Sequence, residues 1–238
     1  MSDKSKFNIN FLNELISYYG DDTDVVIPNG VTKIEPNAFA RCEKVTHITI
    51  PYGVREIGEF AFSFCYSLES IVIPNSVQTI GKYAFWNCEK LTHIDIPNGV
   101  TEIGESAFNS CRGLKSVNIP NSVNNLGRDA FAYCTALNSI AIPQGLRDIS
   151  WGVFLGCTGL TDITIPEHIC EIKDWSFQGC TGLTDVTILG SNTEIRTWAF
   201  YECSPQLNFH VPADSPAEKF QRRYFDRKLW TDDDYNPH

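Results

Sequence analysis

Hydrophobic positions recur along this chain with a fixed period of 23 residues. The unit is clearest from Ile96 to Asn118, IPNGVTEIGESAFNSCRGLKSVN, and its shared pattern is IPxxVxxIGxxAFxxCxxLxxIx. A period of roughly 20 to 50 residues is typical of a solenoid, in which each unit forms one turn and stacks on the next. We therefore expect a single domain over residues 1–238, with eight repeats over 25–211, a cap and tail at 1–24, and a cap and tail at 212–238. The repeats begin at Ile27, Ile50, Ile73, Ile96, Ile119, Ile142, Ile165 and Ile188.

Two columns of the pattern are unbroken, and both predict a ladder of stacked side chains inside the solenoid. Each buried phenylalanine ring contributes about 1.5–3 kcal/mol of transfer free energy, and a cysteine at such a position behaves as a small hydrophobic side chain. The phenylalanines are Phe39, Phe62, Phe85, Phe108, Phe131, Phe154, Phe177 and Phe200. The cysteines are Cys42, Cys65, Cys88, Cys111, Cys134, Cys157, Cys180 and Cys203.

The end of each repeat predicts a β-strand with one buried face. In one example, Ile94 and Ile96 alternate with His93 and Asp95, which is the period of two that such a strand requires. Pro97 ends the strand because it has no N–H to donate, and turn-forming residues follow it. The VxxIG segment predicts a second, short extended stretch, and the AFxxC segment predicts one turn of 3₁₀ or α-helix.

This pattern resembles the BspA-like, treponemal-type class of leucine-rich repeat over residues 27 to about 211. The resemblance implies a leucine-rich-repeat solenoid, a β-rich right-handed superhelix with a parallel sheet on its concave face and short turns or 3₁₀ helices on its convex side. Proteins of this family are typically surface or secreted bacterial proteins that attach to host or matrix proteins. The resemblance thus implies a non-enzymatic, adhesin-type interaction module with a protein partner.

Helical caps are expected at both ends, because a solenoid exposes the core of its first and last turns. After residues 1–9, which we expect to be disordered, five apolar side chains fall on one side of a helix that Gly20 would end. Near the C-terminus, Ser215 and Glu218 form a capping-box signature, and Pro216 suits the first helical position. The five N-terminal side chains are Phe11, Leu12, Leu15, Ile16 and Tyr19; the buried stripe of the second helix is Ala217, Phe220 and Tyr224.

Lysines and arginines gather on the expected C-terminal helix, and residues 231–238 form an acidic tail that we expect to be loose. A solvated outer face of the helix is favoured over a recognition patch. The basic residues are Lys219, Arg222, Arg223, Arg227 and Lys228.

Net charge and hydropathy limit the classes of partner that the chain can bind and bear on its cellular location. A formal net charge of −10 at pH 7 argues against nucleic acid and anionic membranes as partners, since both require clustered Lys and Arg. No apolar run is long enough to insert into a membrane as a helix, and NINFLNELISYY is too polar for a signal peptide. A surface or secreted protein would therefore have lost its leader; the alternative is a cytoplasmic scaffold that binds a cellular protein.

The nine cysteines do not predict a disulfide framework. Eight form one column, where parallel Cβ vectors and tight packing disfavour a bridge although neighbouring Cα atoms would lie about 4.8 Å apart. Cys170 lies outside this column, at the variable position after Ile169. We favour a neutral substitution there over a reactive thiol.

No motif for catalysis or for a cofactor is present. Ser70, His93 and Asp95 would be near enough for a Ser–His–Asp arrangement, but nothing supplies a pocket or an oxyanion hole. His47 and His93 share a column two rungs apart, nearly 10 Å, which a metal ion cannot bridge. We therefore predict no enzymatic activity, no cofactor and no metal centre.

Two columns of carboxylates would repel unless basic residues or Ca²⁺ neutralise them. Asp162 and Asp185 have only Thr164 and Thr187 beside them, which leaves a minor calcium alternative. The other column has basic neighbours, so charge pairing is favoured there. It consists of Asp148, Glu171 and Glu194, beside Arg147, Lys173 and Arg196.

Two surfaces are candidates for partner binding. The concave face presents small polar side chains, whereas tight interfaces usually centre on large aromatic or arginine anchors. The aromatic edge, beside the AF dipeptide, either covers the core or forms a strip for a protein or glycan, and we favour the first. The concave-face candidates are His47, Thr49, Ser70, Val72, His93, Asp95, Ser116, Asn118, Ser139, Asp162, Thr164, Asp185 and Thr187. The aromatic-edge candidates are Phe60, Tyr83, Trp86, Trp151, Trp175 and Trp198.

Overall fold

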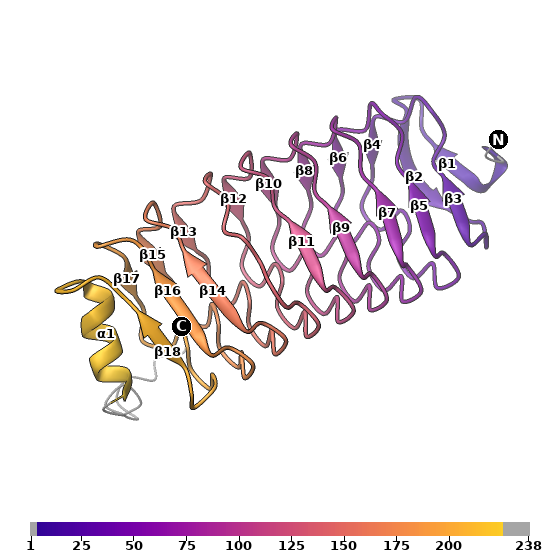
Figure 1. The fold of residues 1–238 in the computed structure, drawn as a ribbon. Coiled ribbons are helices and arrows are strands. Elements are labelled where there is room, and N and C mark those ends of the chain that lie inside the picture. Colours follow the sequence, from indigo (N-terminus) through magenta and orange to yellow (C-terminus); the bar gives the residue numbers. More distant parts are fainter. Residues whose placement is uncertain (1–3, 226–238) are drawn as a thin grey trace.

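The computed structural model describes residues 4–225, which form a rod of stacked rungs (Figure 1). Each complete rung, except the one that ends at residues 139–141, crosses the rod as a longer strand on one side and a two-residue strand on another. The longer strands are β3 (Asp24–Val26), β5 (His47–Thr49), β7 (Ser70–Val72), β9 (His93–Asp95), β11 (Ser116–Asn118), β14 (Asp162–Ile165), β16 (Asp185–Ile188) and β18 (Asn208–His210). The shorter strands are β4 (Lys33–Ile34), β6 (Glu56–Ile57), β8 (Thr79–Ile80), β10 (Glu102–Ile103), β12 (Asn125–Leu126), β13 (Asp148–Ile149), β15 (Glu171–Ile172) and β17 (Glu194–Ile195).

Neighbouring rungs pair in parallel with a register of one sequence period. His47 lies opposite Ser70, and Ile94 opposite Val117, so equivalent residues stack directly. The longer strands form the sheets β3-β5-β7, β9-β11 and β14-β16-β18, and the shorter strands form β4 to β12 and β13-β15-β17. The predicted parallel β-solenoid is confirmed. We call the outward surface of the longer strands the strand face, and the side that carries the AFxxC segments the turn face.

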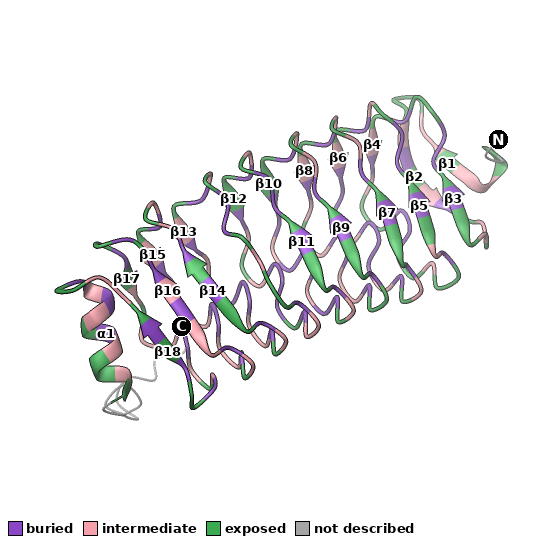
Figure 2. Cartoon of the chain, viewed as in Figure 1, coloured by how far each residue is buried: buried purple, intermediate pink, exposed green. Residues whose placement is uncertain are grey.

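The phenylalanine column is the continuous centre of the core. All eight rings are fully buried, and successive ring centroids lie 5.0 to 6.2 Å apart. Stacked aromatic rings at this distance add to the stabilisation that burial provides. In Figure 2 the buried residues follow the inside of the coil, while the strand face alternates buried and exposed positions.

The cysteine column is a second ladder with free thiols, as predicted. Each thiol from Cys65 to Cys203 donates to the carbonyl oxygen of a phenylalanine in the preceding rung; for example, Cys111 Sγ lies 3.1 Å from Phe85 O. That carbonyl also accepts the N–H of Cys88. The column thus satisfies polar backbone atoms while it fills space.

The AFxxC segments form a series of turns instead of a regular helix. In the second repeat, Ala61 N donates to Gly58 O and Cys65 N donates to Phe62 O, which are the i→i+3 bonds of a 3₁₀ turn. Phe60 and Phe64 both have positive φ, 56° and 60°, and this left-handed backbone stops each turn from continuing as a helix.

The predicted N-terminal helix is wrong, and so is the predicted disorder for the described residues 4–9. A short 3₁₀ helix (Lys4–Lys6) leads into an antiparallel hairpin of β1 (Phe7–Ile9) and β2 (Glu14–Tyr18), and β2 pairs with β4. The Asn10 side chain accepts the N–H groups of Leu12 and Glu14, and Asn13 has φ 61°, so the chain turns here.

Burial also contradicts the apolar stripe of that helix. Leu15 is fully buried, but Phe11 is 92 % exposed and Tyr19 is 72 % exposed. The unanticipated cap residue is Tyr18, whose ring stacks on Phe39 at 5.0 Å and extends the phenylalanine ladder by one step.

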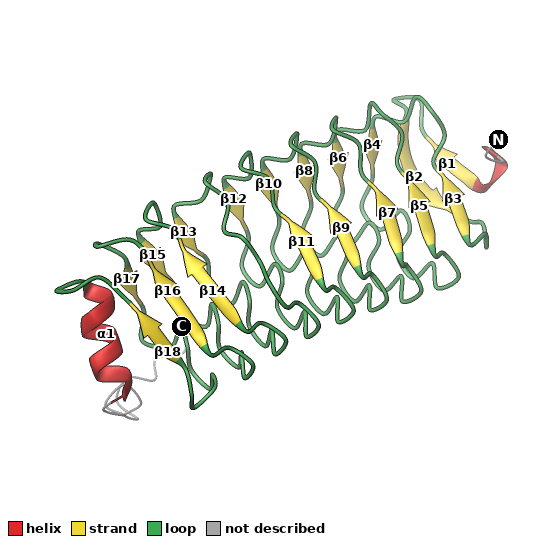
Figure 3. Ribbon diagram, viewed as in Figure 1, coloured by secondary structure: helices red, strands yellow, loops and turns green. Residues whose placement is uncertain are grey.

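The C-terminal cap is helical, as predicted. Helix α1 (Pro216–Phe225) begins where Ser215 Oγ accepts the N–H of Glu218 at 3.1 Å. Ala217 and Phe220 are buried against the last rung, where Phe220 meets Phe200 and Phe209. Figure 3 shows this helix covering one end of the rod. Arg227, Lys228 and the tail 231–238 lie outside the described residues.

Candidate interaction surfaces

The strand face presents short side chains on a regular support. Isoleucine, valine or phenylalanine side chains between them point into the core, which fixes the outward direction of their neighbours. Eleven of the thirteen predicted strand-face residues are exposed, and Asp185 and Thr187 are half-buried. The face therefore forms a flat polar surface without an aromatic or arginine anchor among these positions.

A small hydrogen-bond network occupies its middle. His93 Nδ1 lies 3.0 Å from Ser116 Oγ, and its Nε2 lies 3.0 Å from Asp95 Oδ1. The serine that the sequence suggests for this group is Ser70, but the structure joins His93 to Ser116. The three residues are exposed on a flat strand face. A Ser–His–Asp contact without a water-excluding site or oxyanion hole lacks the main elements of acyl-transfer catalysis.

Two further histidines of this face lie beside carboxylates. His47 Nδ1 is 3.3 Å from Asp24 Oδ1, and His210 Nε2 is 3.2 Å from Asp185 Oδ1. Hydrogen bonds from the Thr184 hydroxyl and then from His210 hold the pKa of Asp185 below its ordinary value. Asp185 therefore stays ionised at neutral pH.

Most carboxylates of the two columns pair with a basic side chain or accept a hydrogen bond from a hydroxyl. Lys173 Nζ lies 3.0 Å from Asp148 Oδ1, and Arg196 pairs with Glu171, as the favoured interpretation predicts. Asp162 lies opposite Asp185 in the sheet and accepts from the Thr161 hydroxyl. Among residues 4–225, no group of three or more His, Cys, Asp or Glu side chains is placed to hold a metal ion.

The aromatic edge on the turn face divides into two clusters. Phe60 and Tyr83 stack with centroids 4.7 Å apart and planes 4° from parallel, and Trp86 lies 5.6 Å from Tyr83. Ser106 and Asp129 occupy the same column in the next two rungs, so the strip is interrupted.

Cations cover rings in the second cluster. Lys173 Nζ lies 4.4 Å from the centroid of Trp151, and the Arg128 guanidinium carbon lies 5.8 Å from that of Trp175. Trp198 contacts Tyr201 edge-on at 5.1 Å. Trp151 is 44 % exposed, whereas Trp175 and Trp198 are half-buried. In most of these rings, part of the surface is therefore covered by neighbouring side chains of the same protein.

A comparison with known protein families identifies the family of this fold. Residues 16–138 and 124–228 match the BspA type leucine rich repeat region, with six copies of the repeat. The chain belongs to the BspA type leucine-rich repeat family.

Solved structures agree with this membership. The leucine rich repeat protein of T. pallidum is similar over 76 % of this leucine-rich repeat chain and 90 % of its own, with 29 % identity and a TM-score of 0.70. A leucine rich cell surface protein from Faecalibacterium prausnitzii A2-165 has the same fold, with 22 % identity, a TM-score of 0.53, and coverage of 90 % and 94 % of the two chains. No curated protein gives a significant match.

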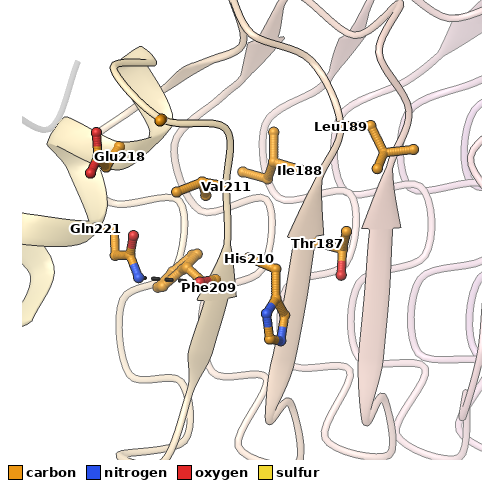
Figure 4. A pocket seen from close by; sticks show the side chains of 9 residues that line it. Thr187, Ile188, Leu189, Phe209, His210, Val211, Glu218 and Gln221 are labelled. Carbon is orange, nitrogen blue, oxygen red and sulfur yellow. Dashed lines mark hydrogen bonds between the residues drawn. The ribbon is translucent and has the colours of Figure 1, made fainter.

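Two cavities near the C-terminal end of this leucine-rich repeat protein are not predicted from its sequence. The larger, about 530 Å³, lies between β16, β18 and α1 (Figure 4). Phe209 and Val211 contribute apolar atoms, His210 and Gln221 contribute polar groups, and Gln221 Nε2 donates to Phe209 O at 3.1 Å. The signal in the sequence is Leu189, which replaces the usual proline and also lines the cavity.

The second cavity, about 350 Å³, contains the exposed Cys170 together with Arg147, His168 and Asn192. Cys170 Sγ lies 3.8 Å from His168 O, a weak contact.

In the part of the chain that the structure describes, no helix has the length and apolar character to cross a bilayer.

Proposed function

We propose that this protein is a non-enzymatic interaction module of the bacterial cell surface or of the secreted fraction, whose strand face binds a host or matrix protein. The observation that carries the proposal is the strand face itself. Exposed polar side chains stand on parallel strands whose inward neighbours are buried, so the surface is fixed before any partner arrives. A preformed surface reduces the entropy lost on binding.

The shape of this surface sets the kind of partner. Nine rungs at about 4.8 Å give a face roughly 40 Å long, and a typical interface buries about 800 Å² on each protein. Because the strand face lacks large anchor residues, a partner must gain affinity from contact over many rungs. An extended or repetitive matrix protein fits this requirement.

The test is binding of purified extracellular-matrix proteins to the immobilised full chain by surface plasmon resonance. We expect Thr49→Arg combined with Asn118→Arg to weaken binding at least about tenfold, which corresponds to 1.4 kcal/mol, because two long cations interrupt the flat face. The matched control on the turn face is Trp151→Ala, which we expect to bind as the wild type does. Loss of binding in Trp151→Ala alone would reject the strand face and favour the aromatic edge.

Two alternatives remain part of the same experiment. The exposed ring of Trp151 favours an aromatic site for a protein or glycan, which a parallel titration with neutral oligosaccharides tests. An intracellular scaffold would leave the matrix panel without a ligand and bind a cytoplasmic protein instead.

A further inference from the structure

The first five rungs stack through a column of close backbone contacts. A Cβ atom added at Gly104 would lie 2.6 Å from Lys82 N, and one at Gly127 would lie 2.4 Å from Glu105 N. Any side chain here requires the backbone to move. The close approach accompanies a regular hydrogen bond to the preceding rung, for example Gly104 N to Ile80 O and Gly127 N to Ile103 O, both 2.8 Å.

This close stacking ends at Ser150, which occupies the position that glycine holds in the preceding four rungs, the glycine column. Among the described residues, the equivalent bonds from Ser150 N to Leu126 O and from Arg147 N to Asn124 O are absent. Strands β12 and β13 accordingly belong to different sheets. The ladder of shorter strands is therefore interrupted between the fifth and sixth repeats.

The strand face is interrupted at the same level. It is also interrupted between β7 and β9, but there the ladder of shorter strands continues through β6, β8 and β10. Residues 139–141, which hold the place of a strand between β11 and β14, have no strand pairing among the described residues, and Figure 3 draws them as loop. Ile140 is half-buried there, while its equivalents Val117 and Ile163 are buried. The core also opens slightly, since the Phe131 and Phe154 rings are 6.2 Å apart, against 5.0 to 5.4 Å for the other pairs in the column.

The turn face stays bonded across this level. Asp129 N donates to Trp151 O at 2.9 Å, and Phe131 N donates to Val153 O at 3.0 Å. Beyond it, both ladders resume: Lys173 N donates to Ile149 O at 3.0 Å, and β14, β16 and β18 form one sheet. Rungs with a side chain in the glycine column thus stack on one another, and the mismatch lies where such a rung follows a glycine rung. In the reverse order, where Gly58 follows Glu35, the bond from Gly58 N to Ile34 O is kept.

We propose that the level between the fifth and sixth repeats is a joint, at which two rigid blocks bend about the bonded turn face. The first block contains the rungs up to β12, and the second those from β13 onward. Bending changes the curvature of the strand face between β11 and β14, so a partner that spans both blocks selects one curvature. The joint follows from the backbone bonds alone and does not depend on what the strand face binds.

Hydrogen exchange of the full chain tests the missing bonds. Arg147 and Ser150 are compared with Thr101 and Gly104, which hold the same positions two rungs earlier and donate to the preceding rung. We expect the first pair of amides to exchange on the order of 100-fold faster, because local opening there breaks no ladder bond.

Distance measurement between spin labels tests the bending. In a Cys170→Ser background, cysteines are introduced at Glu69 and Thr161, which lie four rungs apart across the joint. The matched control uses Thr23 and Lys115, four rungs apart in the same column within the first block. Circular dichroism confirms folding of each variant. We expect a broader distance distribution for the first pair. The joint requires both results, so equal exchange of the two pairs of amides or equal widths of the two distributions would overturn it.

Discussion

At the scale of single residues, the cysteine column both fills space in the core and donates hydrogen bonds to backbone carbonyls. The sequence predicts only the first of these roles. The regular spacing predicts burial, but the S–H bond to a phenylalanine carbonyl depends on the neighbouring rung. Burial in turn controls the chemistry: it raises the pKa of Cys157 to about 12 and that of Cys42 to about 11. These two thiols therefore remain protonated and unreactive at neutral pH, since the thiolate is the nucleophile.

Thiol reactivity and alkaline stability test this account. At pH 8 we expect one thiol, Cys170, to react rapidly with a chromogenic disulfide, and all nine to react after denaturation. The folded-state pKa values are raised, so their stabilising effect is complete below the ordinary thiol pKa of 9.0 and declines as pH rises toward about 12. The urea midpoint should fall accordingly between pH 8 and pH 11 in this measurement. Rapid native reaction of several thiols in a Cys170→Ser variant would contradict the closed ladder.

At the scale of elements, the two caps differ in how far local sequence determines them. Helix α1 has its own start signal at Ser215 and Pro216, so it is predictable without the rest of the chain. The hairpin of β1 and β2 depends on the free edge of β4, and its apolar residues have a spacing that also suits a helix. A periodicity of five side chains cannot separate these alternatives when the deciding contact is tertiary.

Substitutions at the N-terminal cap separate hairpin from helix. Tyr18→Ala should lower the free energy of unfolding by about 3–5 kcal/mol, as for loss of a buried aromatic ring, because Tyr18 stacks on Phe39. Phe11→Ala should change it by less than about 0.5 kcal/mol, as for a surface site. Urea denaturation measures both. A large loss in Phe11→Ala would support the buried stripe of a helix.

The repeated part of the fold is predictable to the level of single positions, and the surfaces are not. Column identity places Phe108 and Cys111 in the core and Ser116 outside, since stacking copies one environment along the rod. Which serine meets His93, how Trp151 and Lys173 combine, and where the ladders break depend on side-chain reach and on small shifts between rungs. Ser150 is visible in the sequence as a departure from glycine, but its consequence appears only when two backbones approach.

At the scale of the whole molecule, the rungs act as nearly independent layers, each held mainly by the layer on either side. The N-terminal hairpin and α1 close the two ends, and the ladder of shorter strands runs unbroken from β4 to β12. The rod should therefore accept removal of one complete layer there, provided that the alternation of buried and exposed positions is preserved.

Deletion of one repeat tests this view directly. Removal of Ile96–Asn118, which is 23 residues, joins Asp95 to Ile119 and keeps every column in phase. We expect a cooperatively folding rod about 4.8 Å shorter, as measured by circular dichroism, thermal unfolding and small-angle scattering. Removal of Ile96–Val117, one residue fewer, leaves Asn118 at the position of Ile96, which is 3 % exposed. An unpaired amide buried there costs about 1–3 kcal/mol, and Ile119 then stands at the position of Pro97, so the turn that follows β9 is out of step by one residue. This second variant should be far less stable, and equal stability of the two would show that the rungs are not held by their common register.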